Sequence, residues 1–218
     1  MASNSNRTRA IIFFFLIFLS SLSIFLIWKG NTPKPIKNNQ SIGAEEVIES
    51  YSEEIYKEAY LLGLNPEYFM ALCMLECGGR RPSPSRFEKH VYRRLINLKA
   101  GKRTHYEKVT IETLKDANES AIKNLASSWG PFQIMGYKVV QEGILIKDLR
   151  GTAAVKHGMK WIANEYGHLL KKDRYSDAFH YHNTGKVIGR DRRIRTHSKT
   201  YVSDGRKWMK YFKKKHNA

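Results

Sequence analysis

The sequence predicts a mainly helical domain that follows an apolar N-terminal segment. Apolar residues recur at helical spacing along most of the chain, which is the pattern of amphipathic helices. Typical helix-end residues flank one apolar segment, with Asn65-Pro66 at its start and Gly78-Gly79 at its end. The sequence contains no strongly alternating stretch of the kind that predicts a half-buried strand. A chain of 218 residues is long enough for one domain of about 150–180 residues with a core, plus an appendage.

The appendage is residues 1–29, which we expect to form a signal anchor in a membrane. Arg7 and Arg9 precede a charge-free and mostly apolar run, residues 11–28. At a rise of about 1.5 Å per residue, a helix of this length just spans a bilayer core. Trp28-Lys29 resembles an interface anchor, and no cleavage site of small residues follows. The domain is therefore expected at the inner membrane facing the periplasm, or secreted if the segment is cleaved.

Residues 30–42 are expected to be a polar and stiff linker, because they contain prolines, lysines and asparagines. The folded domain would then cover residues 43–218. Its first helix is expected from Ala44 to Leu62, with Gly63 at its end. The apolar face of this helix repeats in four-residue steps: Val47, Tyr51, Ile55 and Ala59.

The second helix, from Pro66 to Gly78, carries the most informative residue, Glu76. This is the one carboxylate beyond the first turn of an apolar helix, and Leu72 and Cys73 share its face. Apolar neighbours and the negative end of the helix dipole both disfavour the charged carboxylate, so we expect a raised pKa. A glutamic acid that is protonated near neutral pH is suited to general acid catalysis. The alternative is a solvated glutamate at a frayed helix end.

Further helices are expected along the rest of the domain. Two of them would start at capping boxes, one formed by Ser85 and Glu88 and one by Asp116 and Glu119. Residues 108–114 would form a short hairpin arm. The expected helices run from Ser85 to about Leu98, from Asp116 through Leu125, from about Thr152 to Leu169, from Ser176 to His182 and from Tyr201 to Lys214.

The charge of the chain indicates a polyanionic partner. Lys and Arg number 38 against 20 Asp and Glu, a formal net charge of +18. Nucleic acid, an anionic membrane surface and an acidic cell-wall polymer would each fit this excess. Export makes nucleic acid an unsuitable partner, and the basic run Arg190–Arg195 has no interleaved aromatic residues for stacking on bases. The expected partners are thus a wall polymer, and a membrane through residues 11–28.

We expect neither a metal nor another cofactor. Cys73 and Cys77 lie one helical turn apart, where a disulfide would distort the helix, so both are expected to be small core residues. His180 and His182 face different sides of a helix, whereas a zinc site needs three or four convergent ligands. The Gly-x-x-x-x-Gly-Lys spacing of a phosphate-binding loop is absent from the sequence.

Several short pieces resemble, in their order, the catalytic domain of soluble lytic transglycosylases, within the lysozyme-like superfamily. The main pieces are Leu75-Glu76-Cys77-Gly78-Gly79, Gly130-Pro131-Phe132-Gln133-Ile134-Met135 and Tyr181-His182-Asn183-Thr184-Gly185. Tyr201-Val202 is similar to the start of the closing helix of that family. Phe87-Glu88-Lys89-His90 and the stretch from Ser128 to Gly136 also resemble related N-acetylmuramidases. Together the pieces bracket residues 65–212.

The resemblance implies a lysozyme-like fold, similar to that of lytic transglycosylases and goose-type lysozymes. It implies cleavage of the β-1,4 bond between N-acetylmuramic acid and N-acetylglucosamine in peptidoglycan, with Glu76 protonating the glycosidic oxygen. Asn183 would position a helix end, and Tyr201 would direct its hydroxyl toward Glu76. The residues that the resemblance places at the substrate are Gly130, Phe132, Gln133, Met135, Tyr181, His182, Asn183 and Tyr201.

The sequence also departs from the family pattern. His182 stands where a tyrosine is usual, with Tyr181 one place earlier, so either ring could contact the substrate. The stretch between Glu76 and the turn at residues 130–136 is longer than in the simplest transglycosylases. This extra length is expected to add a lid or a lobe to the cleft.

The mechanism depends on whether a second carboxylate takes part. An inverting hydrolase needs a base about 6.5–9.5 Å from the acid. A lytic transglycosylase, by the resemblance, needs none, because the 6-hydroxyl of the substrate attacks and gives a 1,6-anhydro product. Glu88 is the leading candidate for a base, with Asp116 and Glu119 behind it, but capping already explains the pattern at Glu88 and Glu119. The single-acid mechanism is therefore favoured. A non-catalytic peptidoglycan-binding module and a cationic membrane-active protein are the alternatives from other classes.

Overall fold

The computed structural model describes residues 39–217, and helices make up most of this part of the chain. The prediction of a mainly helical domain is confirmed. The expected membrane segment, residues 11–28, and most of the expected linker lie outside the described residues. Among the described residues, no helix is both long and apolar enough to cross a membrane.

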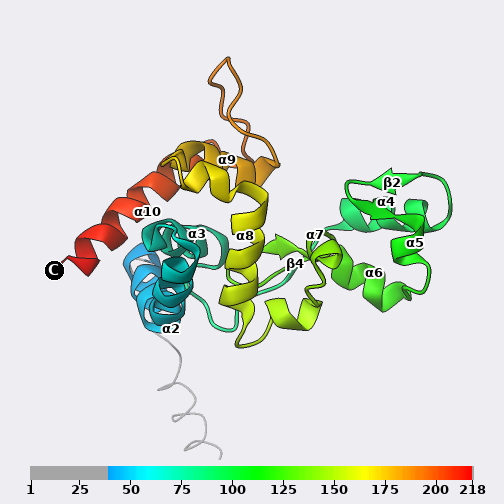
Figure 1. Ribbon diagram of the computed structural model, residues 1–218, viewed down its shortest axis with the longest axis horizontal. Coiled ribbons are helices and arrows are strands. Elements are labelled where there is room, and N and C mark those ends of the chain that lie inside the picture. The colour runs from blue at the N-terminus through cyan, green and yellow to red at the C-terminus, as the bar shows by residue number, and fades with distance from the viewer. Residues whose placement is uncertain (1–38, 218) are drawn as a thin grey trace, which may run out of the picture. The chain divides into compact units, whose positions relative to one another are not determined.

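Five helices share one hydrophobic cluster, which we call the main cluster (Figure 1). They are α2 (Asn39–Leu62), α3 (Pro66–Cys77), α8 (Ala154–Leu170), α9 (Tyr175–Thr184) and α10 (Tyr201–His216). The expected boundaries of these helices are close to the observed ones, except that α2 begins at Asn39 rather than at Ala44. The predicted apolar face of α2 is buried, because Val47, Ile55 and Ala59 are at most 1% exposed.

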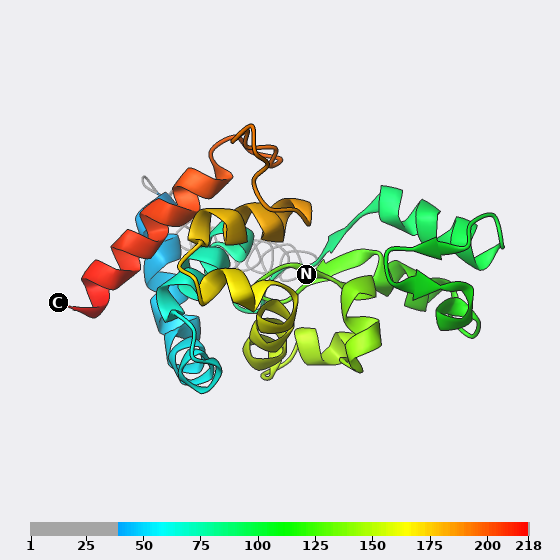
Figure 2. The ribbon, with the colours of Figure 1, turned by 45° about the horizontal axis from the view of Figure 1, so that its top comes forward.

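Helix α3 lies at the centre of the main cluster. Its apolar side chains Phe69, Leu72 and Cys73 are fully buried. Helix α10 packs against both α3 and α9, and Figure 2 shows it beside them. Gly205 permits this contact, because a Cβ atom there would lie 2.8 Å from the ring of Phe179 on α9. The packing of α10 on α3 places the first residue of α10 beside the end of α3.

A second group of short elements encloses its own core, which we call the second cluster. The elements are α4 (Lys89–Lys99), β2 (His105–Tyr106), β3 (Val109–Thr110), α5 (Ile111–Leu114) and α6 (Glu119–Leu125). Strands β2 and β3 form an antiparallel hairpin, so the hairpin expected at residues 108–114 begins earlier and its last residues form α5. The buried residues of the cluster include Val91, Leu95, Tyr106 and Tyr137. This group forms a lobe with a core of its own between α3 and α8 in the sequence.

A small antiparallel sheet connects the two clusters. Its strands are β1 (Arg86–Phe87), β4 (Ser127–Trp129) and β5 (Ile134–Met135), in the order β1-β4-β5. The central strand β4 follows Ala126 of the second cluster and ends at Trp129 of the main cluster. After β5, the chain forms α7 (Gly136–Val139), η1 (Val140–Glu142) and η2 (Ile146–Leu149) before α8.

Both predicted capping boxes are wrong. Residues 86–87 form β1, so α4 starts only at Lys89 with Glu88 as its N-cap, and the Glu88 side chain caps nothing. The second box fails because Asn118 caps α6 through a bond from the amide of Ala121. In the first case strand pairing with β4, a contact between distant parts of the chain, determined the backbone conformation.

The start of α3 provides a test of the local design of this helix. The Asn65 side chain accepts hydrogen bonds from the backbone amides of Glu67 (2.9 Å) and Tyr68 (3.3 Å). We expect Asn65→Ala to lower the free energy of unfolding by about 1 kcal/mol, because it leaves these amides without their cap. Urea denaturation of the full-length chain would measure this. Ser120→Ala, at an exposed position of α6, is the control and should change stability by less than about 0.5 kcal/mol. Equal effects of the two changes would contradict the assignment of the cap.

Candidate active site

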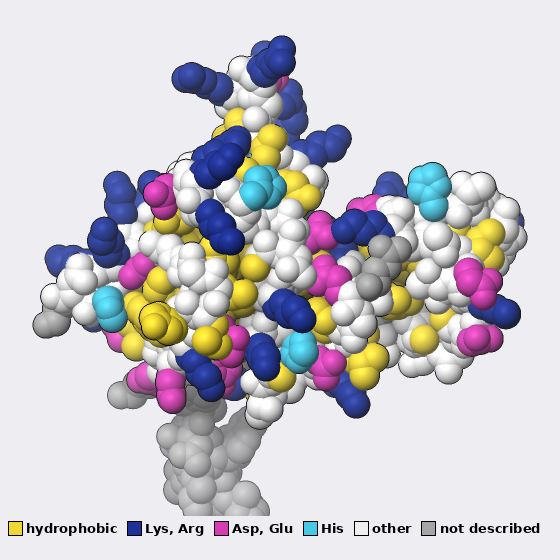
Figure 3. Space-filling model, in the orientation of Figure 1, with side chains coloured by type: hydrophobic (Ala, Val, Ile, Leu, Met, Phe, Trp, Pro, Cys, Tyr) yellow, Lys and Arg dark blue, Asp and Glu magenta, His cyan; other side chains and the backbone are white. Residues whose placement is uncertain are grey.

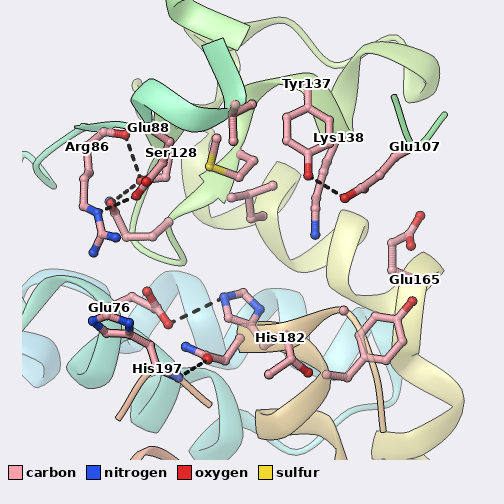
Figure 4. Close-up of a pocket in the computed structure, with 18 of the residues that line it drawn as sticks. Glu76, Arg86, Glu88, Glu107, Ser128, Tyr137, Lys138, Glu165, His182 and His197 are labelled. Carbon is pink, nitrogen blue, oxygen red and sulfur yellow. Dashed lines mark hydrogen bonds and ion pairs between the residues drawn. The ribbon is translucent and has the colours of Figure 1, made fainter. Parts of the chain in front are cut away.

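A pocket of about 750 Å³ separates elements of the main cluster from elements of the second cluster (Figure 4). One wall carries Glu76, His182 and His197, from α3, α9 and the segment before α10. The facing wall carries residues from β1, α4, the β2–β3 hairpin and α7, among them Glu88 and Tyr137. The pocket therefore lies where the sheet joins the two lobes.

Glu76 lies in the last turn of α3 and faces this pocket. Gly78 ends the helix in the left-handed conformation, with φ of 61°, and its amide bonds to the carbonyl of Met74. The Glu76 side chain is 17% exposed. Its Oε1 atom accepts a hydrogen bond from the hydroxyl of Tyr201, the first residue of α10. The contact between Tyr201 and Glu76 that the resemblance implied is thus present.

Burial controls the protonation of Glu76. Loss of solvent raises the pKa of this carboxyl to about 7, against an ordinary value of 4.5. The hydrogen bond from Tyr201 and the positive charge of Arg86 act in the opposite direction, and burial outweighs both. The raised pKa agrees with the expectation from the apolar sequence of α3. Glu76 therefore keeps its proton to a higher pH than an ordinary glutamate does.

His182 lies close to Glu76, with Nε2 at 3.8 Å from Oε1. Burial lowers the pKa of His182 to about 4, so the ring is neutral at pH 7. Its Nε2–H donates to the carbonyl of Phe132 at 2.9 Å, and Nδ1 accepts from the Tyr166 hydroxyl at 2.7 Å. Tyr68 donates in turn to Tyr166 at 3.3 Å. His182 therefore contributes no charge to the site.

Tyr181 and Asn183 line the same pocket on either side of His182. The Tyr181 ring packs against the buried Tyr166 ring, with centroids 5.2 Å apart. The Asn183 Oδ1 atom accepts a hydrogen bond from the backbone amide of His197 at 3.0 Å. Asn183 thus ties the end of α9 to the segment that leads into α10, which is the positioning role that the resemblance implied. Tyr181 and His182 both reach the pocket.

The turn at residues 130–136 contributes differently from what the sequence suggested. Gln133 and Met135 line the pocket, but Gly130 and Phe132 are not among its lining residues. Phe132 is buried, and its backbone carbonyl accepts the hydrogen bond from His182. Gly130 has a φ of 75°, and a Cβ there would lie 2.7 Å from the carbonyl oxygen of Leu149. Both residues therefore shape the wall without facing the pocket.

The side-chain amide of Gln133 is already engaged within the protein. Its Nε2 donates to the carbonyls of Pro84 (2.6 Å) and Gly130 (3.0 Å), and its Oε1 accepts from Ser128 (2.7 Å). Its backbone has a φ of 47°, an unusual value for a residue other than glycine. These bonds hold the turn against the segment before β1. Gln133 consequently serves first to position the turn.

Glu88 faces the pocket from the opposite wall to Glu76 (Figure 4). Its Oε1 accepts from Arg86 Nε at 2.6 Å, and its Oε2 lies 3.4 Å from Nδ1 of His90. Asp116 and Glu119, the other candidates for a base, are exposed and are not among the residues that line the pocket. Glu88 is therefore the sequence candidate for a base that shares the pocket with Glu76.

Sequence reasoning missed the polar residues at the far side of the pocket. Glu107 accepts a hydrogen bond from the Tyr137 hydroxyl at 2.8 Å. Lys108, in the turn of the hairpin, lies 2.5 Å from Glu165 of α8. Lys138 lies over the ring of Trp161, with Nζ 5.6 Å from its centroid. These pairs join residues far apart in sequence, and no local motif marks them.

Within residues 39–217, no three or more His, Cys, Asp and Glu side chains converge as metal ligands. The two cysteines are free and buried, as expected. Comparisons of the chain with protein-family models, curated proteins and solved structures found no match.

The raised pKa of Glu76 has a consequence for stability. Between pH 4.5 and 7 the folded state binds more protons at Glu76 than the unfolded state does, so this residue lowers the free energy of unfolding as the pH rises. A pKa of about 7 instead of 4.5 corresponds to about 3 kcal/mol. Between pH 4 and 6.5, His182 has the opposite effect, because its pKa is lowered. The comparison of a Glu76 variant with the unchanged chain cancels the contribution of His182.

We expect Glu76→Gln to be more stable than the unchanged chain by up to about 3 kcal/mol at pH 8, with the difference vanishing near pH 4. Chemical denaturation of both full-length chains across this pH range would measure it. Glu53→Gln, at an exposed position of α2, should stay within about 0.5 kcal/mol throughout. A stability difference for Glu76→Gln that is the same at every pH would contradict the burial of an ionisable Glu76.

The Tyr201 hydroxyl is expected to hold the pKa of Glu76 down. Its hydrogen bond favours the carboxylate, so Tyr201→Phe should raise the pKa of Glu76 above about 7. NMR titration of ¹³C-labelled glutamate carboxyls would follow the change. Tyr175→Phe provides a control, because the Tyr175 hydroxyl donates to Asp173 and not to the pocket. An unchanged or lower pKa in Tyr201→Phe would show that this hydroxyl does not stabilise the carboxylate.

Proposed function

We propose that this domain has a lysozyme-like fold and cleaves the glycan strands of peptidoglycan, with Glu76 as general acid. The observation that carries the proposal is a carboxyl group at the end of α3 that lines the pocket and accepts a hydrogen bond from Tyr201. Loss of solvent raises the pKa of this group to about 7. A catalytic acid works best when its pKa is near the working pH. The resemblance of the residues around Glu76, Gln133 and Asn183 to lytic transglycosylases supplies the substrate class.

The single-acid mechanism of a lytic transglycosylase agrees best with the surroundings of Glu76. Glu76 would donate its proton to the glycosidic oxygen and thereby become a carboxylate. The same carboxylate would then take the proton of the substrate 6-hydroxyl as that oxygen attacks the anomeric carbon. A pKa of about 7 suits both steps, since one residue must give and accept a proton at neutral pH. The Tyr201 hydroxyl would stabilise the intervening carboxylate.

A hydrolytic muramidase is the second candidate, because Glu88 lines the pocket opposite Glu76. In that mechanism Glu88 would activate a water molecule on the other face of the sugar ring. Its Oε1 accepts a hydrogen bond from Arg86 Nε at 2.6 Å, which orients the Glu88 carboxyl in the pocket. This pair also occupies one oxygen of Glu88, which is why the single-acid mechanism is preferred.

The proposed location follows from the expected N-terminal segment. Residues 11–28 would anchor the chain in the inner membrane with the domain in the periplasm, or the domain would be secreted after cleavage. Either location brings the pocket to peptidoglycan. The partner would be the glycan strand, and the excess of 38 basic over 20 acidic residues would attract its acidic groups.

The central test is the release of soluble fragments from purified sacculi by the full-length chain. We expect Glu76→Gln to lower the rate by a factor of about 10²–10⁴, because the amide cannot donate the proton that the leaving oxygen needs. Glu119→Gln, which removes an exposed carboxylate paired with Lys123, is the matched control and should retain the rate. Mass spectrometry should find products that end in 1,6-anhydro sugars.

Other outcomes would select the alternatives. Products with reducing-end muramic acid, together with a loss of rate in Glu88→Gln, would establish a hydrolase. Binding to sacculi without any release would indicate a peptidoglycan-binding module. If membrane disruption were the only activity and Glu76→Gln left it unchanged, the protein would be a cationic membrane-active protein.

A further inference from the structure

A strongly basic loop, residues 186–199, connects α9 to α10 and projects beyond α9 (Figures 1 and 2). We call it the basic loop. Asp191 is its one acidic residue, and it pairs with Arg195 through Nη1 and Oδ1 at 3.2 Å. Figure 3 shows Lys and Arg side chains gathered where the loop projects. The exposed basic residues of the loop are Lys186, Arg190, Arg192, Arg193, Arg195 and Lys199.

The base of the basic loop is held by a buried histidine. His180 of α9 is 2% exposed. Its Nδ1–H donates to the carbonyl of Lys186 at 2.7 Å, and its Nε2 accepts from the amide of Arg195 at 3.2 Å. One imidazole therefore holds the first residue of the loop together with Arg195, in its second half. In addition, the Oδ1 atom of Asp177 accepts a hydrogen bond from the backbone amide of Ile188 at 3.1 Å. The loop is preorganised, so binding would cost little ordering of its backbone.

The basic loop begins and ends at the rim of the pocket that contains Glu76. Lys186, His197 and Ser198 line this pocket. In Figure 4, His197 and Glu165 lie on opposite sides of the view. On the Glu165 side, the pair between Glu165 and Lys108 connects the two walls at 2.5 Å. A glycan strand that leaves the pocket on the His197 side would therefore pass the basic loop.

We propose that the basic loop binds anionic groups that the glycan strand itself carries, either carboxylates of peptide stems or phosphates of an attached polymer. The inference rests on the proposed function, because it takes the glycan strand as the occupant of the pocket. Arginine supplies the forked donors that match carboxylate and phosphate oxygens. Arg190, Arg192 and Arg193 provide three such groups on a loop whose ends lie at the pocket.

Two other polyanions fit the loop less well. An anionic membrane surface is usually bound by basic residues together with apolar side chains that insert. Of the large apolar residues of the loop, Ile188 is half-buried, and Val187 and Ile194 are 41% and 37% exposed, whereas Tyr60 on α2 is 87% exposed. The loop thus presents charge rather than an apolar wedge. Single-stranded nucleic acid is bound with aromatic stacking, and residues 186–199 contain no Phe, Trp or Tyr.

The test measures binding to sacculi in the full-length chain that carries Glu76→Gln, so that turnover does not interfere. Arg190, Arg192 and Arg193 are replaced together by Gln. In the matched control, Lys210, Lys213 and Lys214 on α10 are replaced together by Gln. These lysines are also exposed, so the control removes the same charge. We expect the loop variant to bind on the order of tenfold more weakly at low salt, and the control to bind nearly normally. The difference should shrink toward zero at about 1 M salt, where charges are screened within about 3 Å.

Two treated substrates distinguish the sources of the anions. Binding of the loop variant and of the control is measured on two kinds of sacculi. One kind has lost its phosphodiester polymers, and the other has lost its peptide stems. Loss of the difference between loop variant and control on one of these substrates supports the proposal and identifies the anion. A difference that persists on both substrates overturns it, as does equal binding of the two variants to untreated sacculi. Weakening of the loop variant only on vesicles of anionic lipid also overturns it, in favour of a membrane surface.

A second loop variant distinguishes loss of charge from loss of the folded structure. Arg190, Arg192 and Arg193 are replaced together by Lys, which keeps the charge and removes the forked donors. We expect it to bind more strongly than the Gln variant, because the charge is kept, and more weakly than the unchanged loop, because the forked donors are lost. Binding as weak as that of the Gln variant, despite normal thermal unfolding, would overturn the electrostatic explanation. Because the assay measures binding by a chain with Glu76→Gln, it can succeed or fail whether or not the unchanged chain cleaves the glycan. Failure of this proposal is therefore distinguishable from failure of the proposed function.

Discussion

The burial of the Glu76 carboxyl at the end of α3 is the constraint on which the site depends. A carboxylate that loses its solvent becomes costly, so the group keeps its proton to higher pH. The structure offers it one hydroxyl, from Tyr201, and no nearby buried cation within the described residues, since His182 is neutral. A guanidinium at that place would have lowered the pKa and removed the acid. The neutrality of His182 is therefore as important to the protonation of Glu76 as the position of Glu76 on α3.

Helix packing delivers the groups that surround Glu76. Helix α10 packs along α3, so its first residue, Tyr201, reaches the last turn of α3. Helix α9 brings His182, which the buried hydroxyl of Tyr166 and the carbonyl of Phe132 hold in one tautomer. These donors and acceptors belong to four different segments of the main cluster. A change in the packing of either helix would alter the protonation of Glu76 without touching the residue itself.

Local patterns allowed part of this arrangement to be predicted from the sequence. The start and end of α3, and hence the place of Glu76 on it, follow from Asn65, Pro66 and Gly78, whose effects extend over a few residues. The capping box at Ser85 was wrong because β4, about forty residues further along the chain, pairs with residues 86–87. Likewise the pair of Lys108 and Glu165 depends on how two lobes meet. The polar far side of the pocket was therefore beyond the reach of sequence reasoning.

The exposed arginines of the basic loop and the carboxyl of Glu76 respond to their surroundings over different distances. The exposed arginines of the basic loop are surrounded by solvent, where salt screens charges beyond about 8–10 Å. The field of such exposed groups can raise the rate of encounter with a polyanion, yet it changes the pKa of a buried acid much less than desolvation does. Arg86 illustrates the balance, since it lines the pocket and lowers the pKa of Glu76, but burial still dominates. A protein with a large positive charge can thus attract an acidic polymer and still keep a protonated carboxyl in its pocket, provided that the cations remain at the rim.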